Sequence, residues 1–402
     1  MSLWNKVLQR KANRDVANNL IEKTQQEMDR IQPINILVAG KTGSGKSTLI
    51  NAVFREKLAE TGVGKPITQH VERITKEGVP LTLFDTKGLE LNPNSQHEVL
   101  TSLSNLIKSQ KSKGTDEAID VVYYCINSTM ARIEPFEIEL IEAMAEHVPV
   151  LLILTQAIGE RNSEFESYLK EQNMPVVSII PVLAKTYIIR GEQRIPAFGL
   201  QQLIDTTLEV VPSEVHKAFI NAQQIDLNIK VEHARRWANK YIASAFGVGF
   251  SPIPIADATL LVPMQVTMLA HITSIFGLSL DKAQIVSIIA GIGGTGGATY
   301  FGKIIVSSAF KMIPGIGTVT GGVISGTTAG MLTIALAYSY IEVLRQISIA
   351  EVEGRDMKIN EIQQIMNKNL SEQLDTVFDN IPDKIKENYL PEWLGSFLKQ
   401  QS

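Results

Sequence analysis

The sequence has almost no cysteine and no excess of basic charge. Cys125 is the single cysteine in 402 residues, which excludes a disulfide framework and a cysteine metal cluster and is typical of the reducing cytosol. None of the six histidines has metal-ligand spacing, so no transition metal is expected. The formal net charge of -4 gives no basic excess for nucleic acid, and we expect no nucleic-acid partner. The N-terminus lacks an apolar segment of signal-peptide length, so export is not expected.

Charge is also nearly absent from one long stretch of the second half. Between Ile242 and Tyr340 the charged residues are Asp257, Asp281, Lys282, Lys303 and Lys311, far below the chain-wide share of 20%. Ala258–Leu280 and Met312–Ile341 carry no charge over 23 and 30 residues, which is long enough to span a bilayer. Ordinary charged sequence lies on both sides of this stretch.

This uneven charge predicts the domain organisation. We expect an N-terminal helical arm over residues 1–32, an α/β domain over 33–211 and a helical domain over 212–402. The helical domain is expected to comprise a hydrophobic, glycine-rich core over 242–341 and a charged tail over 342–402. The arm and the C-terminal helices together would form an all-α domain.

Apolar runs alternate with amphipathic stretches in the predicted α/β domain. The runs are Ile34–Ala39, Pro80–Phe84, Val121–Ile126, Val148–Leu154 and Val176–Leu183. The amphipathic stretches are Ser47–Phe54, Ser95–Lys108, Pro135–His147 and Ser163–Gln172. Continuously apolar strands separated by helices predict a doubly wound, mostly parallel sheet. The alternating segment His70–Gly78 is expected to form a hairpin strand at the edge of that sheet.

The first apolar run leads directly into "GKTGSGKST", which matches G-x-x-x-x-G-K-[ST] between a strand and a helix. Glycines allow backbone N–H groups to turn toward phosphate oxygens, and the helix that follows adds its dipole. We expect Lys46 to contact the β- and γ-phosphates and Ser47 to bind Mg²⁺. An ordinary glycine turn is the alternative, and the strand–helix context argues against it. The residues predicted to contact phosphate are Gly40, Lys41, Thr42, Gly43, Ser44, Gly45, Lys46, Ser47 and Thr48.

The string "DTKG", at residues 85–88, ends the next strand pair after this loop. Strand C-terminal ends face the ligand crevice of a doubly wound sheet. Asp85 is therefore predicted to hold Mg²⁺ through water, and the Gly88 N–H to contact a γ-phosphate.

The order of these elements resembles an Era-like, translation-factor-related P-loop GTPase over residues 34–210. "GVGKPIT" resembles the first switch, in which Thr68 would close over Mg²⁺, and "VLAKTY" resembles the loop whose Ala184 backbone touches guanine. "AFGLQQLI" is similar to the start of the last helix of that domain. The resemblance implies that GTP or GDP binds with Mg²⁺, the latter held by Ser47, Thr68 and Asp85.

Two departures from this family affect catalysis and base choice. Leu89 occupies the position of the water-orienting glutamine, as in many Era-like members, and cannot activate water. The base-recognition string [NT]-K-x-D reads Thr155, Gln156, Ala157, Ile158, so the aspartate that accepts guanine hydrogen bonds is replaced by Ile158. Thr155 and Gln156 remain predicted nucleotide contacts, but a choice of GTP over ATP does not follow.

Hydrolysis therefore needs a group from elsewhere. The resemblance assigns catalysis to Lys46 and Thr68, and Lys41 or Lys87 could offset transition-state charge as an arginine finger does, or be solvated loop lysines. Intrinsic turnover is expected to be slow, on the order of 10⁻⁴ to 10⁻² per second.

The second half resembles the hydrophobic C-terminal domain of a poorly characterised bacterial GTPase family, through "SPIPIAD" and "PMQVTML" in residues 251–269. The architecture also resembles immunity-related and dynamin-like GTPases. Glycines four residues apart permit close helix packing, as at Gly322, Gly326 and Gly330. A membrane-associating segment and a buried hairpin in a soluble domain are both compatible with this pattern.

The N-terminal arm has helical apolar spacing at Leu3, Trp4, Val7 and Leu8 beside basic residues, a pattern compatible with anionic lipid or with docking on the protein itself. Three functions stay open. The chain could be a nucleotide switch or mechanochemical GTPase at a membrane, with nucleotide-dependent dimers or oligomers. It could be a nucleotide-gated scaffold with little hydrolysis. It could be a soluble GTPase whose hydrophobic hairpin forms a core or dimer face. We expect a cytoplasmic protein with possible membrane association.

Overall fold

A computed structural model describes residues 3–55, 63–66, 71–86, 96–189, 193–249, 256–278, 288 and 326–379. The chain forms two compact units. An α/β unit comprises residues 31–226, and a helical unit combines residues 1–30 with residues 227–402. The predicted fold class is confirmed, including an all-α part built from both ends of the chain.

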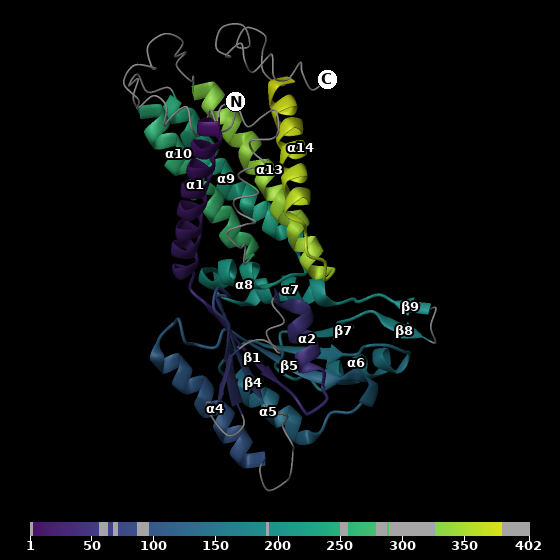
Figure 1. Ribbon diagram of the computed structural model, residues 1–402. Helices are drawn as coiled ribbons and strands as arrows, with labels where there is room; N and C mark the ends of the chain where they lie inside the picture. Colours follow the sequence, from purple (N-terminus) through teal and green to yellow (C-terminus); the bar gives the residue numbers. More distant parts are fainter. Residues whose placement is uncertain are drawn as a thin grey trace. The chain divides into compact units, whose positions relative to one another are not determined.

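Seven of the described strands form the central sheet of the α/β unit, in the order β2-β3-β4-β1-β5-β6-β7 (Figure 1). Neighbours from β4 to β7 run parallel, whereas β2 and β3 pair antiparallel with each other and β3 with β4. The strands are β1 (Ile34–Ala39), β2 (Val63–Pro66), β3 (Val71–Thr75), β4 (Leu81–Thr86), β5 (Val121–Asn127), β6 (Val150–Thr155) and β7 (Ser178–Val182).

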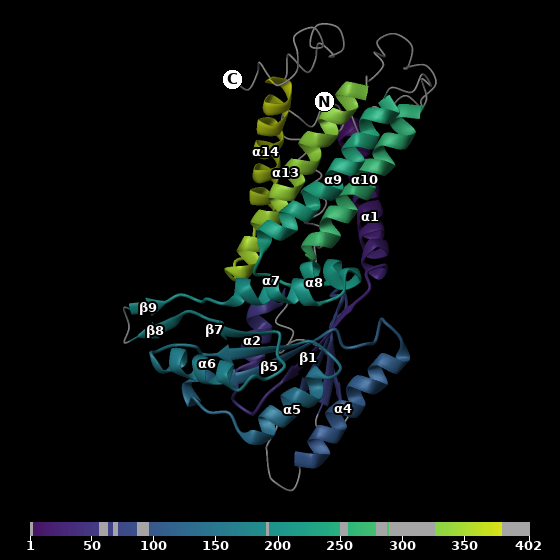
Figure 2. The ribbon, with the colours of Figure 1, turned by 180° about the vertical axis from the view of Figure 1, so that it is seen from behind.

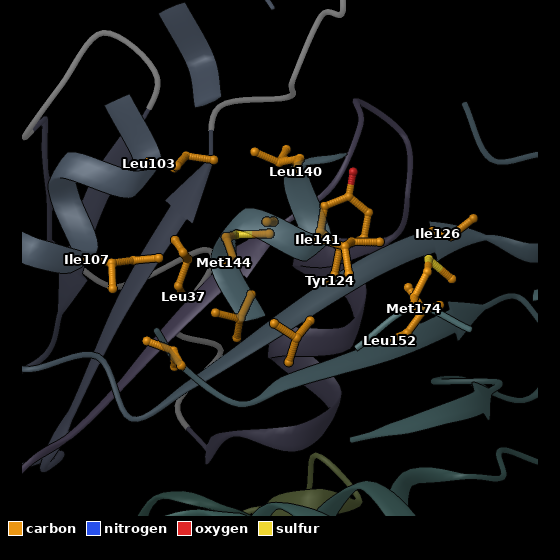
Figure 3. Packing of buried hydrophobic residues seen from close by; sticks show 14 of the residues in the cluster. Leu37, Leu103, Ile107, Tyr124, Ile126, Leu140, Ile141, Met144, Leu152 and Met174 are labelled. Carbon is orange, nitrogen blue, oxygen red and sulfur yellow. The ribbon is translucent and has the colours of Figure 1, made fainter. Parts of the chain in front are cut away.

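Helices cover the sheet because its central strands are apolar on both faces. Every residue of β1 and β6 is buried. Side chains from α4 and α5 pack on β1, β5 and β6 in the main hydrophobic core (Figure 3). The helices of this unit are α2 (Lys46–Val53), α4 (Gln96–Lys113), α5 (Pro135–Ala145), α6 (Arg161–Glu171), α7 (Leu200–Val210) and α8 (His216–Ala222), with 3₁₀ turns η2 (Ser128–Met130) and η3 (Ser213–Val215).

One local prediction was wrong, and one element was not predicted. The strand expected at the sheet edge, β3, pairs on both sides, and the edge strand is β2, within the stretch that resembles the first switch. The hydrophobic alternation of His70–Gly78 reports burial but not edge position, so it could not distinguish the two. A second, two-stranded sheet of β8 (Tyr187–Ile189) and β9 (Gln193–Ile195) follows β7 and was not predicted.

The α/β unit extends to Asp226, beyond the expected boundary at residue 211. Residues after α7 pack on the C-terminal end of α2. The Phe219 ring meets Phe54 edge-on at 6.2 Å between centroids, and the Gln224 Nε2 group donates to the carbonyls of Asn51 and Ala52 at 3.0 Å each. These carbonyls lie in the last turn of α2, where the helix itself provides no donors.

The described part of the helical unit consists of α1 (Leu3–Asp29), α9 (Leu227–Gly249), α10 (Ala256–Phe276), α13 (Gly326–Val352) and α14 (Ile359–Asp379). In this unit α9 packs against α10 and α13, α1 against α10, and α14 against α13 (Figures 1 and 2). Buried hydrogen bonds join α10 to α13, from Gln265 to Thr333 at 3.1 Å and between Thr273 and Tyr340 at 2.6 Å. The helical arm is therefore confirmed as a helix, although the side chains of residues 3–15, including Trp4, lie outside the described ones.

Among the described helices, none combines the length and apolarity that a membrane span requires. The uncharged stretch Ala258–Leu280 lies mostly in α10, which contains Pro263. Of the stretch Met312–Ile341, the described residues belong to α13. Gly322 and the other glycines between residues 291 and 325 lie outside the described residues.

Candidate nucleotide site

The phosphate-binding loop connects β1 to α2, as predicted. Gly40, Gly43 and Gly45 adopt φ values of 140°, 77° and 85°, a region that residues with a side chain rarely occupy. At Gly40 the constraint is also steric, because a Cβ atom would lie 2.3 Å from the Cys125 carbonyl oxygen. The loop thus turns tightly over the end of β5, with Ser47 and Thr48 exposed at the start of α2.

Lys46 is buried at the base of the loop. Its ammonium donates to the carbonyls of Gly40 at 2.8 Å and Lys41 at 3.1 Å. Burial lowers the pKa of Lys46, and the negative charge of Asp85 opposes that effect. The two carbonyls thus hold the Lys46 side chain beneath the loop that is predicted to surround phosphate.

Asp85 is the penultimate residue of β4 and aligns with Val38, near the end of β1 that leads into the loop. Burial raises the pKa of the Asp85 carboxyl to about 6, although the nearby Lys46 ammonium lowers it. Its Oδ1 atom is buried and has no hydrogen-bond partner within the described part of the chain, and neither do Ser44 Oγ and Thr86 Oγ1. An orphaned carboxylate oxygen at this end of the sheet fits a hard cation such as Mg²⁺ and its waters.

Thr155, at the end of β6, supports the loop from the neighbouring strand. Its hydroxyl lies 2.6 Å from the Ser44 carbonyl oxygen, to which it donates, and 3.2 Å from that of Ile126. Asn127, at the end of β5, adds a longer bond from its Nδ2 group to the Gly43 carbonyl at 3.4 Å. Sequence reasoning missed Asn127, although its place at the end of a buried strand was a usable signal.

The predicted base-binding residues lie at the ends of β6 and β7, which align through Thr155 and Val182. Gln156 is exposed and has a φ of 51°, and Ala184 follows β7 by two residues. The Ala157 N–H donates to the Val182 carbonyl at 3.2 Å, which holds the two strand ends together. Ile158 is half-buried where the family pattern places an aspartate.

Lys41 contacts two carboxylates at the start of α5. Its ammonium lies 2.9 Å from Glu134 Oε1 and 2.9 Å from Glu137 Oε2. Glu137 is buried and also accepts hydrogen bonds from the Glu134 backbone N–H at 3.0 Å and the Tyr124 hydroxyl at 3.3 Å. Glu134 forms ion pairs with both Lys41 and Arg132, and these lower the pKa of the Glu134 carboxyl. Lys41 is thus paired with protein carboxylates, and its transition-state role stays a prediction.

Sequence reasoning missed both glutamates. The one available signal was local: Glu134, Pro135 and Glu137 have the spacing of a capping box, which α5 forms. Four other predicted positions, Thr68, Lys87, Gly88 and Leu89, lie outside the described residues. The structure therefore brings the loop, Asp85, Thr155, Gln156 and Ala184 to one edge of the sheet.

Comparison with known proteins identifies two regions of the chain. Residues 35–180 match a family described as 50S ribosome-binding GTPase, and residues 215–372 match a domain of unknown function, DUF697. The chain is 29% identical over 162 residues to Translocase of chloroplast 90 from Arabidopsis thaliana, which covers 36% of this chain and 19% of that protein. It is 22% identical over 211 residues to the tRNA modification GTPase MnmE of Ureaplasma parvum serovar 3, covering 52% and 45%.

Septin-12 of Homo sapiens is 26% identical over 166 residues, covering 35% of this chain and 46% of the septin. Each of these three matches spans less than half of the relative's own length. The chain therefore carries a P-loop GTPase domain followed by a DUF697 domain.

Proposed function

We propose that the chain binds GTP and GDP with Mg²⁺ and hydrolyses GTP slowly, as an Era-like nucleotide switch coupled to its helical unit. The observation that carries the proposal is a buried Lys46 ammonium in the loop after β1, together with a buried Asp85 oxygen on the neighbouring strand β4 that has no hydrogen-bond partner among the described residues. A cation and an unpartnered carboxylate at that position match the phosphate and Mg²⁺ ends of a nucleotide.

Each residue then has a distinct role. Lys46 would leave the loop carbonyls for the β- and γ-phosphates, while Ser47 and Asp85 would hold Mg²⁺, joined by Thr68. When bound, the ion neutralises charge on the β- and γ-phosphates. Thr48, Thr42 and the remaining loop residues would contribute backbone N–H groups, and the Gly88 N–H would contact the γ-phosphate.

Lys41 fits a positioning role better than a catalytic one. Its two carboxylate partners hold it over the start of α5, so its charge is already compensated. Glu137 is buried and accepts hydrogen bonds from three donors. Its ion pair with Lys41 therefore fixes the phosphate loop against the start of α5. The negative charge of the transition state would then be stabilised by Lys46, by Lys87 or by a partner molecule.

Base selection is proposed to be weak. Thr155 supports the phosphate loop, and Gln156 with Ala184 borders the base, but Ile158 cannot accept the two guanine hydrogen bonds. A pocket without those acceptors has less chemistry with which to reject ATP.

The direct test is equilibrium binding of GTP, GDP and ATP to the full chain, with Mg²⁺ and with EDTA. We expect both guanine nucleotides to bind more tightly in Mg²⁺ and Lys46→Ala to abolish binding. Single-turnover GTP hydrolysis in the order of 10⁻⁴ to 10⁻² per second is expected. Turnover equal to that of the Lys46→Ala control would favour the alternative function, a nucleotide-gated scaffold, which the Leu89 and Ile158 replacements suggest.

Coupling to the helical unit is proposed to run along the chain through α2. Nucleotide contacts begin this helix at Lys46, and Gln224 binds its last turn just before α9 starts at Leu227. A shift of α2 would therefore move Gln224, and the chain that links Gln224 to Leu227 would transmit the movement to the first residues of α9. The helical unit is proposed to associate with a membrane surface or with a second copy, as dynamin-like GTPases do; a hydrophobic core of a soluble GTPase is the alternative.

A further inference from the structure

The ribbon of β8 and β9 exposes a run of large apolar side chains. Tyr187, Ile188 and Ile189 are 48%, 56% and 37% exposed, and they are consecutive in the chain. Single exposed apolar residues are ordinary, but three in a row on one projecting element are a candidate interaction surface. Figures 1 and 2 show the ribbon extending beyond β7 and α6 of the same unit.

Both faces of this ribbon are partly apolar. In the antiparallel register Tyr187 lies opposite Ile195, so these two share a face with Ile189, whereas Ile188 lies opposite Arg194 on the other face. The two strands pair with each other in a sheet of their own. A two-stranded hairpin is marginally stable alone, so contact with a further surface would stabilise it.

The charges around these side chains are predominantly basic. Lys185 and Arg194 are exposed, and neither forms an ion pair with any described residue. Other exposed cations of this unit, such as Lys170 and Arg132, do have glutamate partners. Residues 184–198 contain the cations Lys185, Arg190 and Arg194 and one acid, Glu192, in a chain whose net charge is -4.

We propose that the β8–β9 ribbon docks on an anionic lipid bilayer, with Tyr187, Ile188 and Ile189 at headgroup depth and Lys185 and Arg194 against lipid phosphates. Apolar side chains with a tyrosine enter the interfacial region, and neighbouring cations add attraction to anionic lipid. A second copy of the chain is a poorer partner, because a two-fold contact through this ribbon would bring like charges together. The proposal deepens the membrane contact suggested above and places it on the GTPase domain.

Co-sedimentation of the full chain with vesicles tests this, using phosphatidylcholine alone and phosphatidylcholine with 30% phosphatidylserine. The wild-type chain is expected to prefer the anionic vesicles. Ile188→Ser with Ile189→Ser should weaken that binding about tenfold or more, and Lys185→Ala with Arg194→Ala about fivefold per charge. The matched control is Tyr168→Ser with Val177→Ser, two residues of the same unit that are 46% and 49% exposed.

A label on the ribbon reports insertion directly. Burial raises the pKa of the Cys125 thiol to about 12, so an environment-sensitive fluorophore would react selectively with Ile188→Cys. We expect a blue shift with anionic vesicles only, and none for the same label on Tyr168→Cys. Thermal unfolding midpoints confirm that each variant is folded.

Three results would overturn the proposal: no preference of the wild type for anionic vesicles, equal binding by the Ile188→Ser, Ile189→Ser variant, or loss of self-association instead of lipid binding in that variant. The last would identify the ribbon as an interface between copies. GTP affinity is measured on the same samples, so that failure of the nucleotide switch can be distinguished from failure of the lipid contact. Vesicle binding without nucleotide binding would refute the switch and leave the ribbon's lipid contact standing.

Discussion

The ammonium of Lys41 lies 2.9 Å from Glu137, a buried carboxylate that belongs to α5 and is 96 positions further along the chain. The pair ties the phosphate loop to the helix that follows β5 and η2 in the chain. A cation in this position could either fix the geometry of the loop or stabilise the charge of the transition state. Mutation can distinguish these two roles.

Replacing Lys41 with methionine should cost about 1–3 kcal/mol of folding free energy, because it leaves the buried Glu137 charge without its cation. GTP affinity should fall with it. The double variant Lys41→Met, Glu137→Gln should recover both stability and turnover if Lys41 only positions the loop. Recovery of affinity without recovery of single-turnover rate would instead assign Lys41 to catalysis. Lys170→Met, which breaks an exposed pair with Glu166, is the control and should cost less than about 0.5 kcal/mol.

Asp85 should make Mg²⁺-GTP affinity depend on pH. Its folded pKa of about 6 lies above the ordinary value of 3.8, so the folded state holds the proton over the window between them. Ionising this group therefore disfavours the folded chain as the pH rises from about 4 to 6, by up to about 3 kcal/mol, and the effect is constant above pH 6. Binding of Mg²⁺ needs the ionised form, so affinity should decline below pH 6.

Measuring Mg²⁺-GTP affinity from pH 5 to 8 checks this. Asp85→Asn should remove the dependence and weaken Mg²⁺-supported binding. Asp120→Asn is a matched control, because burial also raises the pKa of Asp120 to about 6, but this residue precedes β5 at the opposite end of the strand. A pH profile unchanged by Asp85→Asn would contradict the proposed role.

Sequence patterns predicted the parts of this fold whose determinants are local. β1 was predicted at Ile34–Ala39, where it lies, and the loop that follows it is a contiguous motif. The ion pair of Lys41 with Glu134 and Glu137 joins residues more than 90 positions apart, so spacing along the chain contains no sign of it.

The boundary of the α/β unit was missed for a similar reason. α8 is short and follows a segment that reads as a linker, and what assigns it to this unit is the contact of Phe219 with Phe54 at the C-cap of α2. The β8–β9 ribbon was missed because its strands have three residues each, too few for a periodic signal. Neither feature could be found without tertiary contacts.

Gly40→Ala should be much more damaging than Gly43→Ala. A Cβ atom at position 40 would lie 2.3 Å from a backbone oxygen, so the chain must shift, whereas position 43 has open space around it. Both have positive φ, which costs about 1 kcal/mol for alanine. We expect Gly43→Ala to lose about that amount and Gly40→Ala about 3 kcal/mol or more, measured by urea unfolding. Equal losses would mean that the loop adapts at position 40.

Ile158→Asp should increase the preference for GTP over ATP. It restores at the family position a carboxylate that can accept two hydrogen bonds from guanine. The ratio of ATP to GTP dissociation constants is expected to rise about tenfold or more. The control is Ile158→Asn, because asparagine is similar in size to aspartate but lacks its charge. This variant should change the ratio less. If both variants leave the ratio unchanged, the guanine edge is recognised from another part of the chain.

Gln224→Ala should separate nucleotide binding from its effect on α9. The amide donates to two carbonyls of the last turn of α2, and removing it should cost about 1–2 kcal/mol. Hydrogen exchange of peptides covering residues 219–230 should respond to GTP in the wild type and lose that response in the variant, with GTP affinity changed less than about threefold. Gln201→Ala, which removes exposed bonds to Asp205 and Asp226, is the control. A GTP response that persists in Gln224→Ala would show that the start of α9 senses the nucleotide by a route other than α2.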